Sequence, residues 1–237
     1  MHTLDNQRIL VIGGSSGIGL AIAAATADAG ASVTIASRNQ EKLTAVATKL
    51  SRAVHIAVLD TGDNGLLERF FEKQTAWDHV VVSAAQTKVG SVQSLSLTDA
   101  KAAMESKFWG AYRVARVAHI NGGGSLTLVS GFLSERPSAT AVLQGAINAA
   151  LEALARGLAL ELAPVRVNAV SPGMIETPIW DDLPSEKRKE VFETTAERLP
   201  VRKIGQPEDI ANAVLFLMTT AYATGSTVRV DGGGVIA

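Results

Sequence analysis

Residues 8–19 read RILVIGGSSGIG, and this stretch decides the fold. The apolar run at its start is typical of a parallel strand that is buried on both faces. The glycines behind it allow a tight turn, close approach of the backbone to a pyrophosphate, and close packing of a helix on the strand. An alanine-rich helical pattern follows over residues 20–29, so the free N–H groups at its start would face the phosphates. Strand, turn and helix in this order predict a Rossmann-type dinucleotide site with the contact residues Gly13, Ser15, Ser16, Gly17, Ile18 and Gly19.

Short β-branched runs alternate with longer helical patterns along the rest of the chain. The runs that predict strands are residues 8–12, 32–36, 54–59, 79–82, 126–129, 165–170 and 228–230. The helical patterns cover residues 17–29, 40–50, 64–74, 98–119, 140–162, 185–197 and 207–219. This alternation predicts an α/β fold, a doubly wound parallel sheet of about seven strands with helices on both faces. We therefore expect one Rossmann domain over residues 1–237, built as three α/β/α layers.

A charged excursion over residues 177–202 interrupts this alternation. It carries Trp180, an acidic pair and a charged helical pattern ahead of Pro200. Because it follows the sixth strand, this excursion could form a mobile lid that covers a binding site. A solvated surface helix explains the same residues equally well, and the sequence does not separate the two interpretations.

The composition excludes several classes of function. Lys and Arg number 22 and Asp and Glu number 23, so the net charge of −1 gives no attraction to nucleic acid or to an anionic membrane. The absence of cysteine excludes disulfides, thiolate metal sites and cysteine nucleophiles, and the four histidines show no metal-ligand spacing. No signal peptide or membrane-spanning run is visible. We expect a cytoplasmic protein that holds no metal and takes a small-molecule substrate.

The end of the second strand predicts which dinucleotide is bound. An acidic residue there would bind the ribose hydroxyls of NAD and repel the 2′-phosphate of NADP. This chain instead reads Ala36-Ser37-Arg38, and its next carboxylate is Glu41. The guanidinium of Arg38 suits a phosphate, and the hydroxyls of Ser37 and Ser15 could add donors. We therefore expect NADP(H); the alternative is that Arg38 is an ordinary surface charge before the next helix.

Over essentially its full length the chain resembles the short-chain dehydrogenase/reductase family. The resemblance rests on the glycine turn, on Asp60 after the third strand, and on the sequences LALEL at 158–162, RVNAVSPG at 166–173 and VDGG at 230–233. It implies that Asp60 meets the adenine, and Thr61 beside it joins the cofactor contacts. It also implies a nicotinamide end lined by Pro172, Gly173, Ile175 and Thr177.

The loop after the fourth strand departs from the family pattern. It normally reads Asn-Asn-Ala-Gly, and here it reads Ser83-Ala84-Ala85-Gln86. Only Ala85 is retained. We expect Ser83, Ala84 and Ala85 to keep backbone contacts to the cofactor ribose, while the side-chain hydrogen bonds differ.

The catalytic positions of the family are all substituted. The family uses Tyr-x-x-x-Lys on the long helix, a Ser before that helix, and an Asn on the preceding long helix. Counting back from LALEL puts Gln144 at the tyrosine position and Asn148 at the lysine position. Gly131, with Ser130 beside it, stands at the serine position, and Lys107 stands at the asparagine position. Gln144 cannot transfer a proton at any useful pH, so the usual mechanism of the family cannot operate.

Lysine and asparagine have exchanged helices, with Lys107 on one and Asn148 on the other. We hypothesise that Lys107 places a cation near the nicotinamide ribose or a substrate oxygen, or acts as the acid if burial lowers its pKa. The alternative is an exposed helix charge. Ser130 is a weaker candidate for a substrate hydrogen bond. The candidate catalytic residues are thus Lys107, Gln144, Asn148 and Ser130, and Lys107 also counts as a cofactor contact.

Three functions remain open from the sequence. The first is an NADP(H)-dependent reductase of a carbonyl or quinone with altered proton chemistry, because hydride transfer needs mainly a positioned nicotinamide and a polarised acceptor. The second is a non-catalytic NADP(H)-binding redox sensor, and the third is a silent structural subunit. In the family the long helix packs against its copy in a neighbouring subunit, so its many small residues here imply a homodimer or homotetramer.

Overall fold

A seven-stranded parallel sheet forms the centre of the computed structural model, which describes residues 4–237. Its strands are β1 (Arg8–Ile12), β2 (Ser32–Ser37), β3 (His55–Val58), β4 (Trp77–Val82), β5 (Ile120–Val129), β6 (Arg166–Pro172) and β7 (Thr227–Val230). They lie in the order β3-β2-β1-β4-β5-β6-β7, and every neighbouring pair is parallel. The doubly wound sheet predicted from the alternating pattern is confirmed.

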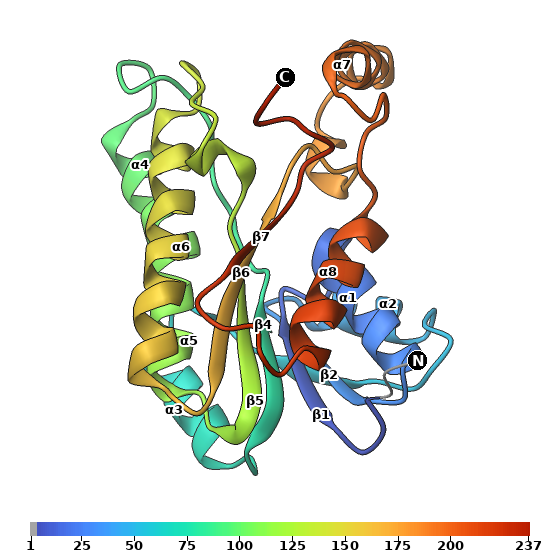
Figure 1. The fold of residues 1–237 in the computed structure, drawn as a ribbon, viewed down its shortest axis with the longest axis vertical. Coiled ribbons are helices and arrows are strands. Elements are labelled where there is room, and N and C mark those ends of the chain that lie inside the picture. The colour runs from blue at the N-terminus through green and yellow to red at the C-terminus, as the bar shows by residue number, and fades with distance from the viewer. Residues whose placement is uncertain (1–3) are drawn as a thin grey trace.

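Helices cover both faces of the sheet and complete three layers (Figure 1). One face carries α3 (Asn64–Glu72), α4 (Leu97–Met104), the π-helix η1 (Glu105–Trp109), α5 (Gly110–Val117) and α6 (Val142–Glu161). The other carries α1 (Gly17–Asp28), α2 (Gln40–Ala47) and α8 (Pro207–Thr219). The short 3₁₀ turns η2 (Phe132–Ser134) and η3 (Pro178–Trp180), and the helix α7 (Ser185–Arg198), follow the ends of strands β5 and β6.

Strand β1 shows why the central runs are apolar at every position. Leu10 and Ile12 pack into the core under α3 to α6, whereas Ile9 and Val11 pack into the core under α1 and α8. Successive side chains of a strand point to opposite faces, so a strand between two helical layers buries both sets. The four residues are at most 1% exposed.

The carboxyl ends of the strands meet at one edge, where the candidate site residues follow them. From β1 the chain winds outward through β2 and β3, and from the adjacent β4 it winds the other way. Ligands of open α/β sheets bind in the crevice outside such a switch point. The turn at Gly13 follows β1, Ser83 follows β4, and Ser130 follows β5, so all three sit at this edge.

Two predicted elements differ from the structure by more than a shift of a few residues at their ends. The continuous helix predicted over 98–119 is divided into α4, the π-helix and α5, and it ends at Val117. Strand β5 begins at Ile120 rather than near residue 126. The sequence pattern did not predict its first half, because the glycines at 122–124 are not typical of a strand. The register of β5 against β4 shifts between the pairs Trp77–Ile120 and His79–Ser125, so this half of the strand is irregular.

Candidate active site

The glycine turn after β1 has no room for side chains. Gly13 has a φ of +90°, and a Cβ there would lie 2.5 Å from the backbone nitrogen of Ala84. A Cβ at Gly19 would lie 2.2 Å from the carbonyl oxygen of Gly13. The helix α1 starts at Gly17, and the hydroxyl of its N-cap residue Ser16 makes no capping bond to the described first turn. The first N–H groups of α1 therefore stay open to an anion, as a pyrophosphate site requires.

The segment after β6 closes over this turn. Thr177 lies beside Gly17, and its Cβ would be 3.3 Å from a Cβ built on that glycine. Ile175 is buried and bridges to Gly205, while the N–H of Gly173 donates to Val230 across the edge of the sheet. The predicted nicotinamide-end residues, which include Pro172 at the end of β6, are thus brought next to the predicted pyrophosphate turn.

At the end of β2 the predicted phosphate residues face different ways. Arg38 is exposed, and its Nη2 donates to Oε1 of Gln86 at 2.8 Å. Because β1 lies between β2 and β4, this bond passes across the carboxyl end of β1. The hydroxyl of Ser37 is buried and has no hydrogen-bond partner within residues 4–237, so it does not face the solvent beside Arg38. Ser15, in the glycine turn, is half-buried.

Asp60, Thr61 and the loop after β4, which were predicted to contact the cofactor, lie at the same edge of the sheet. Asp60 Oδ1 accepts the N–H of Gly62 at 2.9 Å, which holds the turn after β3. The hydroxyl of Thr61 packs against the start of α5, 2.8 Å from the position of a Cβ on Gly110. The N–H of Ser83 donates to Ile12, Ala84 backs the glycine turn, and Ala85 is exposed.

Lys107 lies inside the molecule, in the middle of the π-helix. Lys107 is 8% exposed, and its Nζ donates to Asn148 Oδ1 at 2.7 Å and to the carbonyl oxygen of Ser130 at 2.8 Å. Burial lowers the pKa of Lys107 from 10.5 to about 8, against the opposing effect of the Glu152 carboxylate. The alternative of an exposed helix charge is therefore wrong, and Lys107 and Asn148 do face one another.

The substitutions at the family's catalytic positions fit each other sterically. A Cβ on Gly131 would lie 2.7 Å from Asn148 Nδ2, so a side chain at position 131 would require the amide of Asn148 to shift from its present place. Gln144 precedes Asn148 by one helical turn, which places the two on the same face of α6. Gln144 Oε1 is buried, and no group in the described part of the chain bonds to it.

Ser130 contributes a carbonyl rather than a free hydroxyl. Its Oγ donates to Glu152 Oε1 at 2.9 Å and also lies 3.2 Å from the carbonyl oxygen of Val170. The side chain is therefore committed inward, and the predicted substrate hydrogen bond has no free hydroxyl in this arrangement. Glu152 was not among the residues predicted from the sequence, although a carboxylate four residues after Asn148 on an alanine- and leucine-rich helix was a visible signal.

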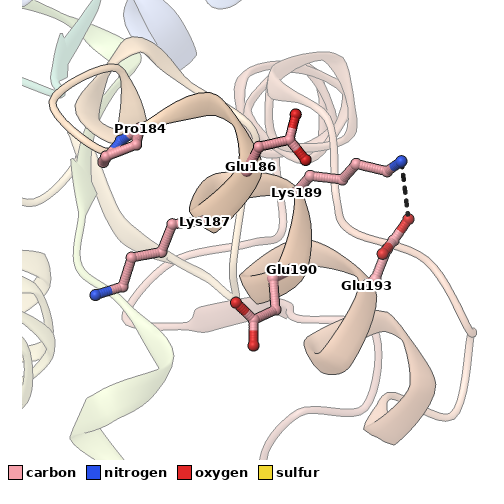
Figure 2. A pocket seen from close by; sticks show the side chains of 6 residues that line it. All are labelled: Pro184, Glu186, Lys187, Lys189, Glu190 and Glu193. Atoms are coloured by element: carbon pink, nitrogen blue, oxygen red, sulfur yellow. Dashed lines mark ion pairs between the residues drawn. The ribbon is translucent and has the colours of Figure 1, made fainter.

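The segment 177–202 folds into η3 and α7 beyond the carboxyl edge of the sheet (Figure 1). Trp180 and Phe192 stack edge to face with ring centres 5.8 Å apart, and this contact ties α7 to η3. None of the residues of α7, all of which the structure describes, is fully buried. Figure 2 shows a hollow on this helix that is lined by Pro184, Glu186, Lys187, Lys189, Glu190 and Glu193, with an ion pair between Lys189 and Glu193 at 3.9 Å.

That hollow contains none of the candidate site residues, and the six residues that line it are exposed. Within residues 4–237 no group of three His, Cys, Asp or Glu side chains is placed to hold a metal ion. In the same range, no helix has the length and apolar character needed to cross a bilayer.

Comparison with known proteins places this geometry in a family. The family model described as Enoyl-(Acyl carrier protein) reductase matches residues 13–234. Short-chain dehydrogenase/reductase ATR9 of Stachybotrys chlorohalonatus is 34% identical, and the match covers 100% of each chain. The 3-oxoacyl-(acyl-carrier-protein) reductase FabG of Chlamydia pneumoniae is 30% identical over 98% of each chain.

Solved structures agree with these relatives. A crystal structure of a small-chain dehydrogenase in complex with NADPH is 36% identical, with a TM-score of 0.82 over 98% of this chain and 100% of that one. The MalC reductase/Diels-Alderase of Malbranchea aurantiaca is 26% identical, with a TM-score of 0.91 over 99% of this chain and 98% of that one. The chain belongs to the short-chain dehydrogenase/reductase family of oxidoreductases.

Proposed function

We propose that this protein is an NADP(H)-dependent reductase of a small carbonyl or quinone compound, in which Lys107 takes over the work of the family's tyrosine and lysine. The observation that carries the proposal is the position of Lys107, buried beside Asn148 and Ser130 in the middle of the substituted catalytic positions. A buried cation with a perturbed pKa at the edge of a sheet is a candidate functional group rather than a solvated charge.

The residues present fit a nicotinamide dinucleotide. The backbone cradle at Gly13 and Gly19 excludes even a methyl group, and the open N–H groups of α1 lie behind it. The carboxylate that would bind the ribose hydroxyls of NAD is missing after β2, and the exposed guanidinium of Arg38 stands in its place. The solved NADPH complex at 36% identity supports the phosphorylated cofactor. We therefore assign NADP(H), with Arg38 as the residue that binds the 2′-phosphate.

Lys107 can polarise and protonate an acceptor oxygen. NADPH supplies a hydride when bound, and the acceptor then needs one proton for the oxygen that gains the electron pair. The two hydrogen bonds made by Nζ to the described residues use two of the three N–H groups of an ammonium, which leaves one for a ligand. A pKa of about 8 keeps most of the amine protonated near neutral pH and makes it a capable acid. Water returns the proton afterwards.

Asn148 and Gln144 have supporting parts in this scheme. Asn148 Oδ1 holds Nζ at 2.7 Å and fixes the direction of the remaining N–H group of Lys107. Gln144 cannot carry a proton, and its buried carbonyl oxygen, unbonded within residues 4–237, is an acceptor that a hydroxyl or N–H of the substrate would satisfy.

The experiment is an anaerobic single-turnover measurement of NADPH absorbance against a panel of carbonyls and quinones. We expect oxidation of NADPH by at least one acceptor, and a large loss of that rate in Lys107→Met. The matched control is Lys101→Met, because Lys101 is an exposed lysine on the neighbouring turn of α4. Equal rates in the wild type and in Lys107→Met would contradict the assigned role.

A second function is favoured by one specific observation. The positions of the family's tyrosine and serine hold Gln144 and Gly131, neither of which transfers a proton. This favours a non-catalytic NADP(H)-binding redox sensor or a structural subunit. Tight NADPH binding with no oxidation by any acceptor, together with a change in partner binding when NADPH is added, would establish the sensor.

We also propose that the chain forms a homodimer or homotetramer through α6. Leu160 on this helix is 85% exposed, and a Cβ built on Gly157 would point into open space within the part of the chain that the structure describes. Small residues on a helix let a second copy approach closely. Light scattering of the wild type and of Gly157→Arg tests this, since the arginine would lower the assembly size.

A further inference from the structure

Glu152 connects the helix α6 to the segment between β5 and α6. Its Oε1 accepts the hydroxyl of Ser130 at 2.9 Å and the hydroxyl of Ser134 at 2.8 Å. These two serines are the ends of a short segment that contains Gly131 and the turn η2. One carboxylate oxygen therefore holds both ends of the segment.

Ser130 links this carboxylate to Lys107. The carbonyl oxygen of Ser130 accepts from Lys107 Nζ at 2.8 Å, while its hydroxyl donates to Glu152. Asn148, the other partner of Nζ, lies one helical turn before Glu152 on the same face of α6. Lys107 is 8% exposed and Glu152 is 7% exposed, so two opposite charges share one buried network.

Two buried charges of opposite sign depend on each other. An ammonium in an apolar interior loses its proton readily unless an anion nearby favours the charged form. The carboxylate also gains from the cation, and its remaining hydrogen bonds come from the two serines. Removal of Glu152 would leave the buried ammonium of Lys107 without the carboxylate that favours its charged form.

We propose that Glu152 is a positioning residue that keeps Lys107 protonated and fixes the segment whose carbonyl Lys107 binds. This inference rests on the proposed role of Lys107 in the reaction. Glu152 touches neither cofactor nor acceptor in this scheme and acts through Lys107, Ser130 and Ser134.

Arg229 is a further charged group near this network. Arg229 on β7 interacts electrostatically with Glu152, Glu135 and Asp231, and its guanidinium is paired with Glu135. Glu135 is the carboxylate that offers a matched control. It lies directly after η2, it is charged, and it is not among the groups that affect the pKa of Lys107.

The test is a pH titration of Lys107 by NMR, with ¹³C-labelled lysine and the Lys107→Met spectrum for assignment. In the wild type we expect a pKa of about 8. In Glu152→Gln we expect the pKa of Lys107 to fall by about one unit, because an opposite charge has been removed. Glu152→Asp should restore the wild-type value, and Glu135→Gln should leave it unchanged. The alkaline limb of the single-turnover rate should move to lower pH by the same amount in Glu152→Gln.

An unchanged pKa of Lys107 in folded Glu152→Gln would overturn the inference. If Glu152→Gln does not fold, the double variant Glu152→Gln/Lys107→Met replaces it, because the uncompensated ammonium is then absent. The double variant must regain the folded state that Glu152→Gln has lost, and a double variant that is equally unfolded would overturn the inference. These measurements need no acceptor. Coupling in a protein that never oxidises NADPH would refute the proposed function alone, whereas turnover without coupling would refute the inference alone.

Discussion

Replacement of Lys107 by methionine removes a buried ammonium and keeps an unbranched chain of similar length. In the wild type, burial lowers the pKa of Lys107 from 10.5 to about 8. At about 1.4 kcal/mol for each pKa unit, this difference corresponds to about 3 kcal/mol. At pH values between these two pKa values, Lys107 is protonated in the unfolded chain and deprotonated in the folded chain. The stability of the folded state therefore rises with pH in this range. The free-energy cost of burying the ammonium of Lys107 is present in full below about pH 8. It disappears above the pKa that Lys107 has in the unfolded chain.

The measurement is the free energy of unfolding in urea for the wild type and for Lys107→Met, at several pH values from neutral to alkaline. We expect the wild-type value minus the variant value to rise by about 3 kcal/mol across the window between the folded and unfolded pKa of Lys107. The subtraction removes the titration of the other groups. The neutral amine keeps two N–H donors for Asn148 and Ser130, so deprotonation does not break those hydrogen bonds.

Lys101→Met provides the control, because it also replaces one lysine by methionine but at an exposed position. A difference for Lys107→Met that does not change with pH would mean that Lys107 titrates as it does in the unfolded chain. A difference that falls with rising pH would mean that its pKa is raised and not lowered. Either result would refute the buried, partly desolvated ammonium on which the proposed chemistry depends.

Four further outcomes follow from the same structure. Arg38→Ala should weaken NADPH binding about tenfold or more while NADH binding changes little, and calorimetry with both cofactors checks this; equal losses would exclude the phosphate role. Gln86→Ala releases Arg38 from its exposed hydrogen bond, so NADPH should bind up to about threefold more tightly, and weaker binding would contradict this account. Gly19→Ala should lower the free energy of unfolding by about 2 kcal/mol or more, because the new Cβ would clash with a backbone carbonyl. Gly157→Ala is the control and should not lower the free energy of unfolding of the monomer, because its Cβ meets open space. The single-turnover rate should fall about tenfold per pH unit above the pKa of Lys107 if its proton is the one transferred, and a rate that is constant there would show that it is not.

The elements that carry the cofactor cradle could be predicted from local sequence patterns. The run before Gly13 is apolar at consecutive positions because β1 is covered by helices on both faces, and that pattern needs no tertiary information. The same holds for the order of elements, since alternating strand and helix patterns lead to a doubly wound sheet. The assignment of Gln144 and Asn148 to the family's catalytic positions stays a prediction, because it rests on counting along α6 from the later motifs.

The partners of those residues could not be predicted in the same way. The bond between Arg38 and Gln86 joins the ends of two strands that are neighbours of β1 in space, and no sequence period relates them. The network of Glu152 with Ser130 and Ser134 also depends on how η2 packs on α6. Such contacts arise from tertiary packing, which determines hydrogen-bond partners that local propensity does not contain.

The π-helix that carries Lys107 has a consequence for chain length. An α-helix turns by about 100° for each residue, whereas a π-turn accommodates one extra residue before the next helix resumes. A deletion of one residue within Glu105–Trp109 would therefore let α4 and α5 fuse into a regular helix and would rotate Lys107 relative to one of them. The amine would leave Asn148 without any change in amino-acid type at the site. Loss of a single codon could thus silence this site as completely as substitution of the lysine.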